Sequence, residues 1–118
     1  MAFPSRVQGA GQSGGATTAI CGDVSAAVTA TGSSATDALS VSAVVVRSAT
    51  TASGTGVKLP APEAGAMMVV RNDGAETLTV YPPTGSTING SASDSIAAGK
   101  ANLYFGTSGT TWVSLDGA

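Results

Sequence analysis

The stretch from Gly56 to Pro83, GVKLPAPEAGAMMVVRNDGAETLTVYPP, constrains the fold more than any other part of the chain. Residues 66–72 are mostly apolar and compatible with a strand, and apolar residues alternate with threonine over 77–81. Asp73-Gly74 lies between these segments and suits a tight reversal, because glycine takes a positive φ without steric cost. The stretch therefore predicts a β-hairpin. Prolines flank it, and proline cannot occupy a central ladder because it has no N–H.

Short apolar segments separated by Gly, Pro or Asn turns continue over the rest of the chain. They predict strands at 38–51, 55–59, 87–88, 95–98, 101–106 and 110–115, with a short strand or an irregular segment at 19–31. Strands of this length, spaced about 8–14 residues apart, favour antiparallel sheets. We therefore expect an all-β fold: an antiparallel β-sandwich, jelly-roll-like or barrel-like, over residues 19–118. No repeat of fixed period is visible, which argues against a solenoid.

The predicted core is thin. Val, Leu, Ile and Phe together make up only 22 of the 118 residues, and a thin core leaves a single domain little margin of stability. We therefore expect the chain to form oligomers or to dock onto a larger surface, since assembly adds buried area. The alternation of apolar residues predicts a core of Leu39, Val41, Val45, Val57, Leu59, Met68, Val70, Leu78, Val80, Ile88, Ile96, Leu103, Phe105 and Trp112.

Residues 1–18 are rich in Gly, Ser and Ala and show no periodicity, so they predict an extended arm that becomes ordered against a partner. Gly9 to Gly14 match the G-x-G-x-x-G pattern of dinucleotide-binding sites. That motif needs a strand before it and a helix after it, and neither is predicted here, so the match is attributed to chance. Cys21 is expected to be a small half-buried residue, because no histidine or basic neighbour would lower the pKa of its thiol.

Charge and composition exclude several classes of function. Five scattered basic residues and a net charge of −2 do not form the basic face that nucleic acid requires. No apolar run is long enough to span a membrane or to serve as a secretory signal. The chain has no histidine, the commonest general base and metal ligand. The carboxylates fall mostly in predicted turns, so we expect no enzyme activity, no cofactor, no metal and no small-molecule substrate.

The aromatic residues allow a second interpretation. Tyr81, Tyr104, Phe105 and Trp112 could form a platform for stacking sugars, although Phe105 and Trp112 lie where a core short of large residues needs bulk. Tyr81 precedes two prolines at the end of a strand and is expected to face a partner subunit. The alternative interpretation of these residues is therefore a carbohydrate-binding module.

Residues 37–115 also carry a resemblance to a known family. These residues are similar to a β module of tailed-bacteriophage virion proteins. The shared pattern is G-V-x-L-P, a strand ending in N-x-G, V-Y-P-x-x-G-x-x-I-N, A-G-x-x-x-x-x-F and a final Trp. Within that family the chain most resembles the small capsid decoration (cement) proteins, some of which are trimers. The matching positions are Gly56-Val57, Leu59-Pro60, Asn72, Gly74, Val80-Tyr81-Pro82, Gly85, Ile88-Asn89, Ala98-Gly99, Phe105 and Trp112.

The resemblance implies a protein of the capsid surface that binds the major capsid protein and stabilises the shell, with a homotrimer as the expected assembly. The standalone length of the chain favours this role over the alternative that the resemblance leaves open, a receptor- or carbohydrate-binding module of a tail fibre or another tail-associated protein. Phe3, Pro4 and Arg6 are the expected capsid-docking residues of the arm, because Phe3 is a bulky anchor in a segment of small residues. Apolar residues opposite the predicted core imply a covered surface, so the expected subunit contacts, together with Tyr81, are Val44, Val46, Met67 and Val69.

Overall fold

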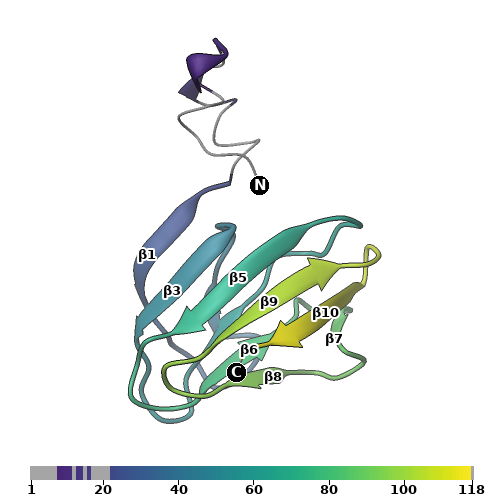
Figure 1. The fold of residues 1–118 in the computed structure, drawn as a ribbon. Helices are drawn as coiled ribbons and strands as arrows, with labels where there is room; N and C mark the ends of the chain where they lie inside the picture. Colours follow the sequence, from purple (N-terminus) through teal and green to yellow (C-terminus); the bar gives the residue numbers. More distant parts are fainter. Residues whose placement is uncertain (1–7, 12, 15, 17–21, 118) are drawn as a thin grey trace.

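The computed structural model describes residues 8–11, 13, 14, 16 and 22–117. It confirms an all-β fold with two sheets (Figure 1). The predicted strands from 55 onward are found to within two residues, whereas the region 38–51 contains two strands separated by a bend. The strands of the described residues are β1 (Val24–Thr29), β2 (Leu39–Ser40), β3 (Val45–Thr50), β4 (Gly56–Lys58), β5 (Met67–Asn72), β6 (Leu78–Tyr81), β7 (Thr87–Ile88), β8 (Asp94–Ile96), β9 (Ala101–Gly106) and β10 (Thr111–Asp116).

The first six strands wind as a β-solenoid, so the expected antiparallel sandwich is wrong for this part of the chain. Strands β1, β3 and β5 lie side by side and parallel in one sheet, which we call sheet A. Strands β2, β4 and β6 lie parallel in the other, sheet B. The chain alternates between the sheets at every step, and each pair of strands (β1–β2, β3–β4, β5–β6) forms one coil. Parallel neighbours require a crossover, and here the crossover passes through the opposite sheet.

The remaining strands, β7 to β10, introduce antiparallel pairs and complete both sheets. Strand β8 pairs antiparallel with β6 in sheet B, and β9 pairs antiparallel with both β5 and β10 in sheet A. Strand β7 ends sheet A as a parallel neighbour of β10. The order in sheet A is therefore β1-β3-β5-β9-β10-β7, and in sheet B it is β2-β4-β6-β8. The antiparallel expectation therefore holds for the pairs made by β8 and β9 and fails for β7.

The coils have unequal lengths, and this hid the repeat. Val24, Val45 and Val69 are register partners across sheet A, at intervals of 21 and 24 residues. Leu39, Val57 and Val80 are partners across sheet B, at intervals of 18 and 23 residues. Self-similarity at one fixed period is the usual sequence signature of a solenoid, so turns of variable length between short strands remove it.

The expected hairpin at Asp73-Gly74 does not form. Strands β5 and β6 lie in different sheets, and the turn between them carries the chain from one sheet to the other. Gly74 does not have the expected positive φ. A Cβ atom at this position would instead overlap the backbone of Thr51 in the preceding coil. The glycine is thus required by close contact between coils.

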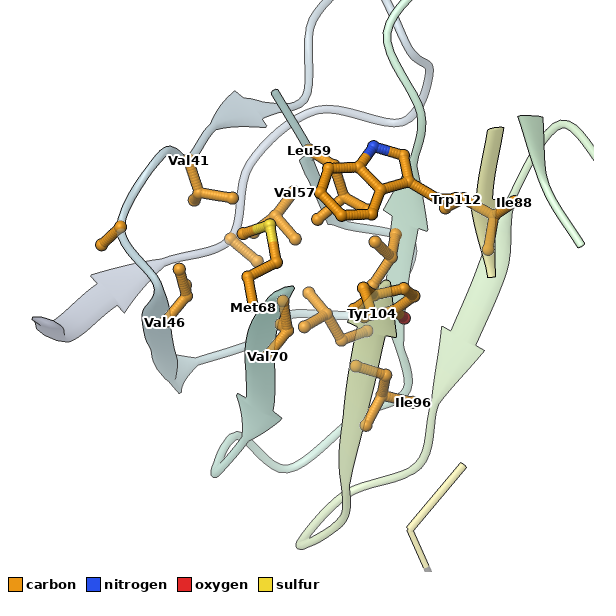
Figure 2. Packing of buried hydrophobic residues seen from close by; sticks show 14 residues of the cluster. Val41, Val46, Val57, Leu59, Met68, Val70, Ile88, Ile96, Tyr104 and Trp112 are labelled. Carbon is orange, nitrogen blue, oxygen red and sulfur yellow. The ribbon is translucent and has the colours of Figure 1, made fainter. Parts of the chain in front are cut away.

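One core lies between the two sheets. Trp112, Tyr104, Met68 and Leu59 extend into the same cluster as the buried valines of both sheets (Figure 2). Most residues of the predicted core are buried, and Leu39 packs against the cluster at its margin. The buried hydrophobic residues include the small side chains Ala30, Ala38 and Ala43, which lets two sheets of a chain poor in large residues approach closely.

Three residues of the predicted core lie on the wrong side of their strand. Val45 is exposed and Val46 is fully buried, because the chain bends between β2 and β3 and the alternation restarts there. Leu103 and Phe105 are only half-buried and face outward. Tyr104 takes the inward position, since its hydroxyl finds a partner inside the domain.

That partner is Asp94, and the contact makes stability depend on pH. Tyr104 Oη donates to Asp94 Oδ2 at 2.8 Å. Burial, followed by the charge of Asp94, raises the pKa of Tyr104 well above its ordinary value of 10.0. The folded chain therefore holds the phenolic proton at a pH where the unfolded chain releases it. Stability from this effect is present below about pH 10 and is lost as the pH rises further.

Replacing Tyr104 with phenylalanine should remove this alkaline loss. Above about pH 10 the free energy of unfolding of the original chain should fall by about 1.4 kcal/mol per pH unit more steeply than that of Tyr104→Phe. Urea unfolding followed by circular dichroism on both sides of that pH measures the difference. Equal slopes in the two proteins would contradict the assignment.

Candidate functional site

The outer side of sheet A carries an exposed apolar surface. The large hydrophobic residues exposed among the described residues are Val24 (64%), Leu115 (62%), Met67 (46%), Val45 (37%) and Val113 (36%). All five are on strands of sheet A and share its outer side with the half-buried Val69, Leu103 and Phe105. We call these eight residues the apolar face.

Strand register places the apolar face in two rows. In the longer row, direct partners run across five strands: Val24, Val45, Val69, Leu103 and Leu115. In the shorter row the partners are Met67, Phe105 and Val113. Single exposed hydrophobic residues are normal on a protein surface, whereas a contiguous patch indicates a surface that another molecule covers.

Two arginine residues border the apolar face toward the C-terminal ends of β3 and β5. Arg47 and Arg71 are register partners on the outer side, and both donate to the carboxylate of Asp73. The Arg71 Nε–Asp73 Oδ1 distance is 2.6 Å. The hydrogen bond from Arg47 is the main reason that the pKa of Asp73 lies below its ordinary value, and Arg71 adds to the effect. Two guanidinium groups share one carboxylate, so this cluster has a positive excess.

The other end of β5 opens into a pocket of about 250 Å³. Its lining includes Val44, Pro60, Met67 and Trp112, and Glu63 is the one carboxylate among the lining residues. Trp112 Nε1 donates to Pro60 O at 3.0 Å, so the indole N–H is already paired. The pocket is small and mostly apolar, and Met67 connects it to the apolar face. It offers contact surface for a side chain and contains no pair of acid–base groups.

A metal site built from carboxylates is a further candidate. In the part of the chain that the structure describes, no three Asp, Glu, Cys or His side chains are placed to hold a metal ion. Asp94 accepts hydrogen bonds from Tyr104 and Asn102 inside the domain, which gives it a structural role.

The aromatic residues do not form one platform. Trp112 and Tyr104 are buried in the core, and Phe105 lies on the outer side of sheet A. Tyr81 is half-buried on β6 in sheet B, where its hydroxyl donates to Ser33 O at 2.9 Å. A surface for sugar stacking by these four residues is therefore not assembled within one chain.

The residues expected at a subunit interface separate into different places. Met67 and Val69 lie on the apolar face, Val44 lines the pocket, and Tyr81 lies on the other sheet. Val46 is 0% exposed and leaves no surface for a partner, so its expected role is wrong. Phe3, Pro4 and Arg6 are outside the described residues, and their docking role stays a prediction.

Sequence reasoning missed most of the apolar face. Val113 and Leu115 could have been found, because an inward Trp112 places its odd-numbered neighbours on the opposite side of the strand. Leu103, Phe105 and Val45 were instead placed in the core by an alternation that was out of phase.

Comparisons with known proteins gave no match to a family model, to a curated protein or to a solved structure. The described residues contain no helix that is long and apolar enough to cross a membrane.

Proposed function

We propose that this chain is a structural protein of a tailed bacteriophage that binds the outside of the capsid and stabilises the shell. The observation that carries the proposal is the apolar face, which is suited to contact with another protein. The small pocket beside it is mostly apolar, with Glu63 as the one carboxylate among its lining residues. The sequence resemblance to capsid decoration proteins selects the virion as the place of assembly.

In this proposal two parts of the chain have different tasks. Residues 1–18 lie along the capsid subunits, with Phe3, Pro4 and Arg6 as the docking residues. The β domain remains outside the shell and holds copies of the chain together. A unit that contacts two or three capsid subunits at once makes each later contact effectively intramolecular, so the shell gains stability by avidity. The resemblance implies a trimer, and this copy number stays a prediction.

Deleting residues 2–18 should abolish binding to shells and leave the β domain folded. The experiment is cosedimentation of the purified protein with empty capsids of the phage that encodes it. Circular dichroism of the shortened chain serves as the folding control. Normal decoration by the shortened chain would contradict the arm model. Absence of shell binding by the full chain, together with binding to host polysaccharide, would favour the tail-fibre alternative.

A further inference from the structure

We propose that a second copy of this chain covers the apolar face, with the two faces packed together about a two-fold axis. The inference does not depend on the capsid, because it rests on the outer side of sheet A alone. All of the large exposed hydrophobic residues that the structure describes lie on this side. The strands of sheet B carry none of these residues. The outer side of sheet A is therefore strongly apolar, whereas the outer side of sheet B is compatible with exposure to solvent.

The size of the face matches a small specific interface. Five strands about 4.8 Å apart, with about six residues of about 3.3 Å each, give a footprint of roughly 500 Å². Two copies then bury roughly 1,000 Å², which is at the lower limit for a specific protein–protein interface. We therefore expect a dimer that dissociates on dilution.

The rows of the apolar face are complementary to themselves. A two-fold axis that runs across the strands, between the two rows, places the longer row of one copy against the shorter row of the other. Met67 then lies opposite the partner's Val69, and Phe105 opposite the partner's Leu103. Two sheets that pack face to face keep their strands within about 30° of each other, which allows these rows to meet.

The charged residues favour this two-fold arrangement, in which the strands of the two copies run antiparallel, over an arrangement in which they run parallel. With strands parallel, Arg47 and Arg71 of the two copies would meet at the same level, and four guanidinium groups would share two carboxylates. With strands antiparallel, each arginine pair lies near the beginning of the partner's β5. Glu63 precedes that strand by four residues and is exposed. Like charges in register cost energy, and opposite charges in register fix the orientation.

A three-fold arrangement uses the face differently. Around a three-fold axis each copy touches two neighbours along the margins of its face, and the two rows are not buried together. The two-fold pair thus departs from the trimer that the resemblance implies. The mass in solution distinguishes the two.

The first experiment is sedimentation equilibrium of the full chain over a wide range of protein concentration, without shells. We expect the mass to approach twice the 11.3 kDa of one chain. Met67→Glu should raise the dissociation constant by at least about tenfold, because it introduces a charge at the centre of the interface. The matched control is Ser95→Glu, an exposed position on β8 in sheet B, which should leave the dissociation constant unchanged. Leu115→Lys repeats the test at a more exposed site if Met67→Glu does not fold.

The second experiment tests the orientation by exchange of charge. Glu63→Arg and Arg71→Glu should each weaken the dimer, and the double variant should recover part of the lost affinity. A mass of one chain at every concentration would overturn the proposal, as would equal effects of Met67→Glu and Ser95→Glu. A mass of three chains, or no recovery in the double variant, would overturn the antiparallel two-fold pairing. Because no shell is present, none of these results depends on capsid binding.

Discussion

Replacing Asn72 with alanine should lower the free energy of unfolding by about 3–5 kcal/mol, a large part of the stability of a small domain. Asn72 is fully buried at the end of β5. Its Oδ1 accepts from Thr51 Oγ1 at 2.8 Å and from Gly74 N at 3.0 Å. Its Nδ2 donates to Glu76 O at 2.7 Å and to Ile96 O at 2.9 Å. One side chain therefore ties two coils to the β5–β6 turn and to β8.

The cost arises from the partners that alanine leaves behind. A buried donor or acceptor without a partner costs about 1–3 kcal/mol, and water replaces only the partners that it can reach. Urea unfolding followed by circular dichroism measures the loss. Asn89→Gly is the matched control, because Asn89 is exposed and has a φ of 53° that glycine adopts easily. It removes two hydrogen bonds to Ser114 that lie in water. A similar loss in both variants would show that burial of Asn72 is not the cause.

Replacing Trp112 with alanine should lower the free energy of unfolding by about 3–5 kcal/mol, a large part of the stability of a domain with a thin core. Trp112 is 1% exposed and is the largest fully buried side chain that the structure describes. Its ring belongs to the same buried cluster as Leu59, Val57 and Met68 (Figure 2). Its N–H donates to Pro60 O. The alanine variant loses the free energy gained by moving the ring out of water. It also loses the contacts between the ring and the residues around it.

Two further variants separate the causes. Trp112→Phe keeps most of the volume and loses the hydrogen bond, so its cost should fall well below that of alanine. Leu115→Ala lies on the same strand at an exposed position and should change the stability of a single chain by less than about 0.5 kcal/mol. Circular dichroism is the readout, because the chain has one tryptophan and both Trp112 variants remove its fluorescence. A mild effect of Trp112→Ala would mean that the core does not depend on this ring.

The positions of the strands could be predicted from sequence, whereas their partners could not. Alternation and turn residues located β4, β7 and β9 well, because these signals are local. Which sheet a strand joins depends on where the chain goes after each turn, and the turn at Asp73-Gly74 looks like a hairpin in the sequence. The close contact between Gly74 and Thr51 that decides the outcome joins residues from two different coils.

The apolar face was hidden for a related reason. Alternation predicts that every second residue shares a side, and it does not predict which side is the inner one. In β9 the buried bond between Tyr104 and Asp94 decides this, and in β3 the bend after Ala43 decides it. The two strands with the wrong phase each have a polar residue at an inward position, Asn102 in β9 and Ser48 in β3, so hydrophobicity alone does not identify their inner side.

Strand β9 lies inside sheet A but comes late in the sequence, so it determines how late in synthesis the domain can complete its fold. The three coils of β1 to β6 emerge in the order in which they stack, so a growing chain can add them one after another. The free edge of β5 must nevertheless wait until residues 101–106 appear, since β9 occupies the position between β5 and β10. A nascent chain that has made only its coils therefore has β5 paired with β3 on one edge and presents the other edge of β5 to its surroundings, where another chain could pair with it.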